Sequence, residues 1–261
     1  MNNLMSKYQK ELINISAEKD LSLTPLGSVG AWPIWLVRTH YAYTPKKKNV
    51  LIVAGFHGEE QAGPWGALEW LRAYDADNYK GINISLLPVV NPTAFNKKMR
   101  YNTWGEVSNQ GFAHPELHNE PSTEGKILLK HIDRLYSLSM NGFLSLHEDE
   151  TLRTGYYLYT FEPTSEPGQF TCGMLDALHK WWEVPLNGLS VTADSHLTSP
   201  PFIVNGLVYK YCDGALEDYM FHRGVKRVAV TETPGKAKFS KRVECNTNLV
   251  DIFIDLIKKG V

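Results

Sequence analysis

The residues best suited to chemistry in this sequence are two histidines and two glutamates that lie far apart along the chain. His57 and Glu60 are separated by two residues, so an imidazole nitrogen and a carboxylate can reach one ion across a tight turn. Catalytic zinc commonly takes two histidines and one carboxylate and leaves a fourth position for water. His57, Glu60 and His147 therefore predict a three-ligand zinc site. Glu232 is the predicted general base, because a carboxylate beside a zinc-bound water can take its proton and pass it to a leaving amine.

These residues are positioned by segments that predict strands. Residues 50–53 form an unbroken apolar run, the pattern of a strand that is covered on both faces of a sheet. Gly55 and Gly58 then allow the sharp turn that carries His57 and Glu60. Three other predicted strands deliver polar residues at or just after their ends: 82–90 before Asn91, 142–147 ending in His147, and 225–232 ending in Glu232. Because ligands in open α/β sheets gather at the carboxyl ends of strands, we expect these side chains to converge.

Each signal taken alone has a simpler interpretation. The pattern His-x-x-Glu arises often by chance and is common in surface turns. A histidine at a strand end is more often satisfied by local hydrogen bonds, and an isolated arginine such as Arg100 is most often a surface salt-bridge residue. It is the convergence of several strand ends that favours a metal site over these alternatives.

Predicted helices alternate with the strands. In residues 63–74 apolar positions recur at helical spacing, so this segment should pack against the sheet. Other helices are predicted over residues 5–17, 122–139, 168–182, 213–223 and 241–259, and further strands over 31–39 and 155–161. Residues 93–121 and 184–204 are predicted loops, and a loop as long as 93–121 is usually functional. The alternation predicts one α/β/α domain over residues 1–261, with a mixed, mostly parallel, twisted sheet flanked by helices.

Composition narrows the class of protein. The 261 residues are 43% hydrophobic, which is ample for a core, and the formal net charge is −1 with acids and bases mixed along the chain. This balance does not favour binding to nucleic acid or to a charged membrane surface. The chain has no apolar run long enough for a transmembrane helix and no apolar signal segment near its start, so we expect a cytoplasmic protein. Cys172, Cys212 and Cys245 are too far apart to suggest a cysteine zinc site or a disulfide framework.

The order of motifs resembles that of the zinc carboxypeptidases of the carboxypeptidase A superfamily, which includes the succinylglutamate desuccinylase and aspartoacylase branch. The resemblance covers residues 50–232, most of the chain. The matching motifs, in order, are His-Gly-Glu-Glu at 57–60, Asn91-Pro92, Arg100-Tyr-Asn, Asn109, His147, a tyrosine near 209, and Thr-Glu-Thr-Pro at 231–234. Order and spacing together are far more specific than any one motif. The resemblance implies a zinc carboxypeptidase-like fold, with His57, Glu60 and His147 corresponding to the zinc ligands and Glu232 to the catalytic carboxylate.

The resemblance also implies residues that handle the substrate. Arg100 resembles the arginine that polarises the scissile carbonyl and stabilises its oxyanion. Asn109 matches the asparagine that helps to grip the terminal carboxylate of the substrate. Tyr209 matches the mobile tyrosine that closes over the substrate, with Tyr211 as a close competitor.

The sequence departs from the family pattern around the substrate. Gln110 stands where family members usually carry an arginine, and glutamine cannot supply the charged bidentate fork of arginine. Glu59 stands where digestive-type members have another arginine. Glu148, Asp149 and Glu150 add negative charge, most simply in a solvated turn. We hypothesise that the pocket prefers a neutral or cationic group where relatives hold an anion, or that the acidic residues bind a second metal ion.

The predicted function is that of a zinc-dependent amide hydrolase with one zinc ion, a metallocarboxypeptidase-like peptidase acting on small peptides. An N-acyl amino acid deacylase is the alternative within the superfamily, because Asn-Pro-Thr-Ala followed by Arg-Tyr resembles the aspartoacylase branch as closely. A third alternative is a non-catalytic peptide-binding protein. Glu232 argues against it, because a pure binding site needs no base beside the metal. The sequence does not specify the oligomeric state.

Overall fold

A computed structural model describes residues 3–39, 47–112, 120–189 and 201–261 of the chain. The described helices are α1 (Leu4–Glu18), α2 (Ala62–Ala73), α3 (Pro92–Lys97), α4 (Thr123–Lys130), α5 (Ile132–Ser139), α6 (Gln169–Trp181), α7 (Leu216–His222) and α8 (Phe239–Lys259), with a short 3-10 turn, η1 (Ala76–Tyr79). The described strands are β1 (Ser22–Val29), β2 (Trp32–Arg38), β3 (Lys48–Ala54), β4 (Ile82–Leu87), β5 (Gly142–Asp149), β6 (Gly155–Phe161), β7 (Val184–Pro185), β8 (Gly188–Leu189), β9 (Phe202–Ile203), β10 (Leu207–Tyr209) and β11 (Val228–Pro234).

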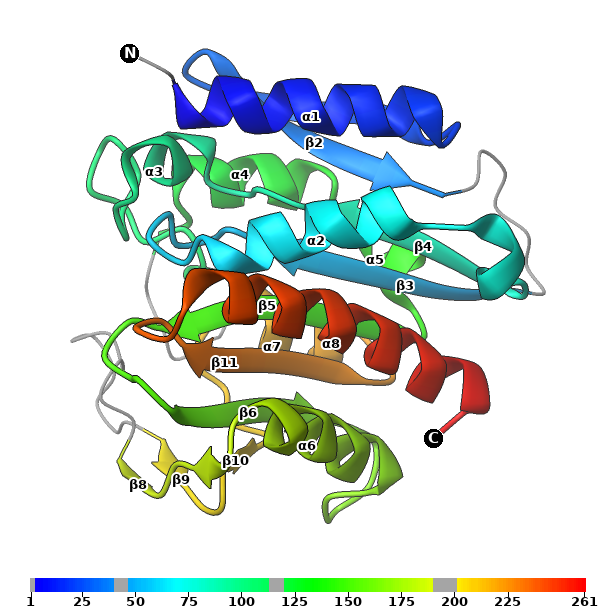
Figure 1. The fold of residues 1–261 in the computed structure, drawn as a ribbon, viewed down its shortest axis with the longest axis vertical. Helices are drawn as coiled ribbons and strands as arrows, with labels where there is room; N and C mark the ends of the chain where they lie inside the picture. The colour runs from blue at the N-terminus through cyan, green and yellow to red at the C-terminus, as the bar shows by residue number, and fades with distance from the viewer. Residues whose placement is uncertain (1–2, 40–46, 113–119, 190–200) are drawn as a thin grey trace.

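Most of the strands form one mixed sheet in the order β1-β2-β4-β3-β5-β11-β6-β10 (Figure 1). The four central strands, β4, β3, β5 and β11, are parallel to one another. An antiparallel strand flanks them on each side, β2 next to β4 and β6 next to β11, and β1 pairs antiparallel with β2 at the edge. This is the mixed, mostly parallel sheet that the sequence predicts.

Helices cover both faces of the sheet, and the alternation of side chains along β3 explains why. Val50 and Ile52 pack into a core with α1, α2, α6 and α8, whereas Leu51 and Val53 pack into a core with α4, α5 and α7. Figure 1 shows α2 and α8 in front of the sheet, with α7 behind β5 and β11. A strand buried on both faces must be apolar throughout, and that is the pattern of residues 50–53. None of the described helices combines the length and apolar composition needed to cross a bilayer.

Residues 122–139, predicted as one helix, form two helices instead. The backbone leaves helical geometry at His131, with φ −113° and ψ 12°, so α4 ends and α5 begins there. The His131 Nε2 atom lies 2.7 Å from the carbonyl oxygen of Leu26 in β1. The apolar spacing that predicts a helix is present in both halves, but nothing in it reports this contact with a distant strand.

Residues 93–121, predicted as a loop, contain helix α3 at their start. Pro92 occupies the first turn, and the Asn91 side chain accepts a hydrogen bond of 3.0 Å from the Ala94 amide, which caps the helix. Such a short helix leaves too few residues for a periodic pattern. Residues 113–119 of this stretch, with His114 and His118, lie outside the described residues, as do residues 190–200 of the other predicted loop.

Candidate active site

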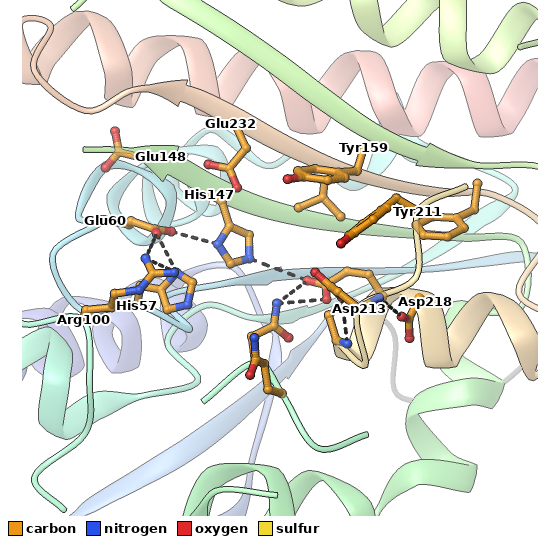
Figure 2. Close-up of a pocket in the computed structure, with 16 residues that line it drawn as sticks. His57, Glu60, Arg100, His147, Glu148, Tyr159, Tyr211, Asp213, Asp218 and Glu232 are labelled. Atoms are coloured by element: carbon orange, nitrogen blue, oxygen red, sulfur yellow. Dashed lines mark hydrogen bonds and ion pairs between the residues drawn. The ribbon is translucent and has the colours of Figure 1, made fainter. Parts of the chain in front are cut away.

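The polar residues that follow the central strands line one pocket of about 750 Å³, measured out to its open mouth (Figure 2). His57 and Glu60 lie in the turn between β3 and α2, His147 lies in β5, and Glu232 lies in β11. Because β3, β5 and β11 are consecutive parallel strands, their carboxyl ends bring these four residues together. Asn91 is fully buried and caps α3, so it supports the pocket without lining it.

His57, Glu60 and His147 form a compact group that could hold a metal ion. Among the described residues, they are the one set of three such side chains whose candidate ligand atoms all lie within 4.8 Å of one another. Glu60 lies between the rings, with Oε1 2.6 Å from His57 Nδ1 and Oε2 2.9 Å from His147 Nδ1. The exposed fractions are 7%, 3% and 3%. The two imidazole Nδ1 atoms and the carboxylate of Glu60 are thus close enough to bind one ion.

The electrostatics of this group depend on burial and on the shared carboxylate. Burial lowers the pKa of His57, and the positive charge of Arg100 lowers it further against the pull of Glu60. Burial alone would also lower the pKa of His147, but Glu60 and Glu217 raise it well above its ordinary value. The two rings lower the pKa of Glu60 although burial opposes this. Without a metal ion, these interactions favour an ionised Glu60 beside a protonated His147.

The donor set fits a transition metal ion. Imidazole nitrogen with carboxylate oxygen suits zinc and related ions, whereas calcium and magnesium prefer all-oxygen sites. The buried Nε2 of His57 has no hydrogen-bond partner among the described residues, so Nδ1 is the ring atom that the surrounding structure engages. A metal bound there would meet three ligands from two elements.

The ring of His147 is supported from its far side by α7. Its Nε2 lies 3.0 Å from Ser145 Oγ and 3.6 Å from the Oε1 atom of Glu217. Burial alone would raise the pKa of Glu217, but the hydrogen bond and the charge of His147 lower it, so Glu217 is an anion. An outer carboxylate of this kind holds a proton on one ring nitrogen and leaves the other free to bind a metal.

Sequence reasoning missed Glu217, because it lies inside a predicted helix and belongs to no motif. Asn109, predicted to bind substrate, lines the pocket, but its Nδ2 atom donates to the two carboxylate oxygens of Glu217 at 3.2 and 3.0 Å. The Oδ1 atom of Asn109 accepts a hydrogen bond of 3.3 Å from the amide of Leu216. The described contacts of Asn109 therefore orient Glu217 and the start of α7. The signal available in the sequence was an acidic residue near the start of the helix predicted over residues 213–223, shortly after the candidate tyrosines.

Glu232 lies directly beside His147. The register of the parallel pair β5 and β11 places Glu232 opposite His147, and neighbouring strands are about 4.8 Å apart. Figure 2 shows the Glu232 carboxylate next to the His147 ring. Burial raises the pKa of Glu232 well above its ordinary value; His147 opposes this rise and Glu60 adds to it. A raised pKa brings a carboxyl group closer to the range that suits proton transfer near neutral pH.

Arg100 reaches the same group from the segment after α3. Its Nη1 atom lies 3.5 Å from His57 Nδ1, 3.7 Å from Glu60 Oε1 and 3.6 Å from Glu59 Oε1. The guanidinium thus stands at the edge of the pocket, where it can meet negative charge that develops on a substrate. Glu59 lies beside it and holds it by an ion pair.

The structure separates the two candidate tyrosines. The hydroxyl of Tyr209 donates to the carbonyl oxygen of Thr164 at 2.8 Å and lies 3.1 Å from that of Glu166, away from the pocket. Tyr211 lines the pocket (Figure 2). The correspondence drawn for Tyr209 is therefore not supported, and Tyr211 is the better placed of the two. The physical reason is that strand β10 ends at Tyr209 and Lys210 takes a left-handed conformation with φ 53°, so the chain turns between the two tyrosines and Tyr211 does not share the orientation of Tyr209.

Glu148 and Asp149 do not lie in a solvated turn, whereas Glu150, just after the strand, is partly exposed. Strand β5 continues to Asp149, and Glu148 and Asp149 are 2% and 0% exposed. Glu148 forms an ion pair of 2.7 Å with Arg242, and Asp149 accepts hydrogen bonds from Thr151 at 2.6 and 2.8 Å. These carboxylates are engaged by the protein itself, which argues against a second metal ion on them.

Acidic residues form the part of the pocket wall near the start of α7, and aromatic and apolar residues form another part of it: Tyr159, Phe161, Tyr211, Ala215 and Val230. Asp213 and Asp218 line the pocket from the start of α7, and Asp218 accepts hydrogen bonds from the amides of Asp213 and Gly214 at 2.7 and 2.8 Å. Gln110 also lines the pocket and is 8% exposed. Arg100 is the one lysine or arginine among the described residues of the wall. No other arginine or lysine among the described residues of the wall replaces the two positive charges that the family pattern places at positions 59 and 110.

Comparisons with known proteins found a family model and solved structures that are similar to this chain. Residues 46–154 match a family model for the succinylglutamate desuccinylase/aspartoacylase catalytic domain. A candidate metallopeptidase from Shewanella denitrificans OS217 is 36% identical with a TM-score of 0.85, and the alignment covers 97% of this chain and 90% of that one. A candidate metallopeptidase from Shewanella baltica OS155 is 32% identical with a TM-score of 0.88, covering 97% and 92%. No curated protein matches the sequence.

A more distant structure shares the fold. The metallo-carboxypeptidase from Burkholderia cenocepacia is 15% identical with a TM-score of 0.71, and the match covers 98% of this chain and 69% of that one. At this identity the likeness concerns the fold alone. With two relatives above 30% identity over nearly their whole length, and a compact group of two histidines and a glutamate at the strand ends, the chain belongs to the zinc carboxypeptidase superfamily, near its succinylglutamate desuccinylase/aspartoacylase branch, and is a metal-dependent hydrolase.

Proposed function

We propose that this protein is a zinc-dependent amide hydrolase, a metallocarboxypeptidase-like peptidase that acts on small peptides. The observation that carries the proposal is the convergence of His57 Nδ1, His147 Nδ1 and the Glu60 carboxylate, with Glu232 opposite His147 in the sheet register. His57, Glu60 and His147 would hold the ion. A zinc ion in such a site supplies a Lewis acid for the carbonyl and lowers the pKa of a bound water to about 7.

The chain's own residues supply the proton transfers and the binding of charge. Glu232 takes a proton from the attacking water and returns it to the leaving amine, which its position beside His147 and its raised pKa both suit. Arg100, which lies beside Glu60, stabilises the negative charge that develops on the carbonyl oxygen of the substrate. Burial of the ligand group keeps bulk water away and strengthens these interactions.

The pocket wall favours substrates that carry a neutral or cationic group where relatives hold a carboxylate. Gln110 replaces an arginine, and Asp213, Glu217 and Asp218 give this side of the pocket negative charge. A carboxylate placed there would be repelled, whereas an amide or an amine would not. Peptides that end in an amide should therefore be cleaved at least as well as the same peptides with a free terminal carboxylate. The Gln110→Arg variant should gain activity on the carboxylate form, and no gain would count against this preference.

The second candidate function is deacylation of N-acyl amino acids. The match of residues 46–154 to the desuccinylase and aspartoacylase model favours it, because such enzymes cleave an amide at the same kind of site. The two functions share the ligand group, the base and Arg100. They differ only in what lies on either side of the scissile bond.

One experiment separates the alternatives. Purified protein is stripped with a chelator, reloaded with one equivalent of zinc, and assayed on short peptides and on a panel of N-acyl amino acids. Turnover of peptides, absent after stripping and restored by zinc, is the expected result. Faster turnover of N-acyl amino acids would assign the deacylase function. Zinc and peptide binding with no turnover of either class would replace both with a non-catalytic peptide-binding protein.

A further inference from the structure

Glu148 follows His147 directly along β5, but its side chain leaves the sheet on the opposite face. Leu144 and Leu146, which share its face of the strand, pack into the core that contains α2 and α8. His147 instead faces α7 through Glu217. Figure 2 shows the Glu148 carboxylate turned away from the His147 ring. Glu148 also lines the pocket beside His147, but its carboxylate is held by the layer of helices that contains α2 and α8.

Both oxygens of the Glu148 carboxylate are engaged. Oε1 forms an ion pair of 2.7 Å with Nη1 of Arg242 in α8, and Oε2 accepts a hydrogen bond of 2.8 Å from the amide of Ala62, the first residue of α2. The side chain of Glu148 is fully buried, and that of Arg242 is 12% exposed. The Nε atom of Arg242 also donates to the carbonyl oxygen of Ala237 at 3.1 Å, which fixes the direction of the guanidinium.

These contacts join the two elements that carry the ligand group. Ala62 lies two residues after Glu60, at the end of the turn that holds His57, and Glu148 lies one residue after His147. The start of α2 and β5 also approach closely, since a Cβ atom at Gly63 would lie 2.9 Å from the carbonyl oxygen of Leu146. An anion at a helix N-terminus is favourable, so the Ala62 amide and the Arg242 charge both stabilise Glu148 in place.

We propose that Glu148 and Arg242 act as a positioning pair that sets the distance between the His57–Glu60 turn and His147. The inference rests on the proposed metal-binding role of these three residues. Metal–ligand distances tolerate a spread of only about 0.2 Å, so a site built from two separate elements needs those elements fixed to each other. A turn alone does not achieve this, whereas a buried carboxylate tied to α2 and α8 does.

The first test compares zinc affinity in matched variants. Glu148→Gln and Arg242→Met remove one charge each and leave the side chains of His57, Glu60 and His147 unchanged, and Arg242→Lys keeps the charge. Competition with a chromophoric chelator should give zinc binding that is about 10- to 100-fold weaker in the first two. Arg242→Lys should remain within a few-fold of wild type, because a charge partner for Glu148 is retained.

Asp251→Asn is the control for a purely structural effect. Asp251 lies on α8 and accepts a hydrogen bond of 2.7 Å from Trp70 of α2, so it bridges the same two helices away from the pocket. Its loss should lower the melting temperature and leave zinc affinity unchanged. If Asp251→Asn weakens zinc binding as much as Glu148→Gln, the effect is general loosening and the positioning role is wrong.

Amide hydrogen exchange on the chelator-stripped protein tests the pair without any metal. Exchange in residues 55–63 should be faster in Glu148→Gln and Arg242→Met than in wild type and Asp251→Asn. Unchanged exchange together with zinc affinity within threefold of wild type would overturn the proposal. If wild-type protein binds no zinc, the proposed function fails, yet the exchange comparison still reports whether the pair fixes the turn. Should Arg242→Met not fold, Arg242→Lys and Glu148→Gln carry the comparison.

Discussion

Replacing Glu232 by glutamine should separate catalysis from metal binding and from stability. Glu232 is opposite His147 in the β5/β11 register but is not one of the three residues that converge through His57 Nδ1, His147 Nδ1 and Glu60. Glutamine has nearly the same shape and cannot take a proton. The variant should therefore keep the pocket and the metal while losing the base.

The size of the effect follows from the role of a positioned base. Such a base contributes about 10²- to 10⁴-fold in rate, and each tenfold factor corresponds to about 1.4 kcal/mol of barrier. The loss in kcat for Glu232→Gln should thus correspond to about 3 to 5 kcal/mol. The zinc dissociation constant should change by less than about tenfold, since outer partners that do touch ligands typically cost 10- to 100-fold.

Stability of the variant provides the third measurement. Burial raises the pKa of Glu232 well above 4.5, so its ionised form is disfavoured in the folded protein. A carboxyl group with a raised folded-state pKa costs stability increasingly as pH rises above its unfolded value of about 4.5. The chelator-stripped Glu232→Gln variant should therefore be at least as stable as wild type at pH 7 to 8. A variant that keeps kcat within threefold, or that unfolds more easily at pH 8, would refute the assignment of Glu232 as a catalytic base with a raised pKa.

Three further outcomes are expected. Glu217→Gln should weaken zinc binding about 10- to 100-fold in chelator competition, because His147 loses the carboxylate that orients it; unchanged affinity would contradict this. Tyr211→Phe should lower kcat/KM more than Tyr209→Phe, because Tyr211 lines the pocket whereas the Tyr209 hydroxyl donates to a backbone carbonyl outside it. The reverse order in steady-state assays would assign the substrate contact to Tyr209. In the chelator-stripped protein, the Glu60–His147 pair should stabilise the fold most between about pH 4.5 and 6.5. Its contribution is lost below this range as Glu60, whose pKa is lowered, becomes protonated, and above it as His147, whose pKa is raised, loses its proton; denaturation midpoints that do not change with pH across these limits would argue against the pair.

The sequence was sufficient for the elements that depend on local patterns. The apolar run at residues 50–53 marks a strand that is buried on both faces, and the helical spacing in residues 63–74 marks the helix that follows it. Both are confirmed as β3 and α2. Gly55 and Gly58 predict the turn. Gly58 is required there because a Cβ atom would lie 2.0 Å from the backbone of Ala94. These features can be predicted because the physics that produces them acts over a few residues.

Other features depend on contacts between distant segments, and the sequence pattern did not report them. The break at His131 is held by a carbonyl group in β1, and the burial of Glu148 depends on Arg242 far along the chain. Glu217 supports His147 only because α7 packs behind β5. In each case a polar group that would normally be solvated acquires its partner from another element.

The sequence by itself determined which residue types could bind a metal, in what order they occur, and that a parallel sheet would carry them to one edge. Only the tertiary structure decided that His57 and His147 present Nδ1 to a common carboxylate, that Glu232 sits opposite His147, and that Tyr211 lines the pocket in preference to Tyr209. The reason is that residue type and periodicity are properties of short segments, whereas the orientation of a side chain depends on strand register and on the groups that pack around it.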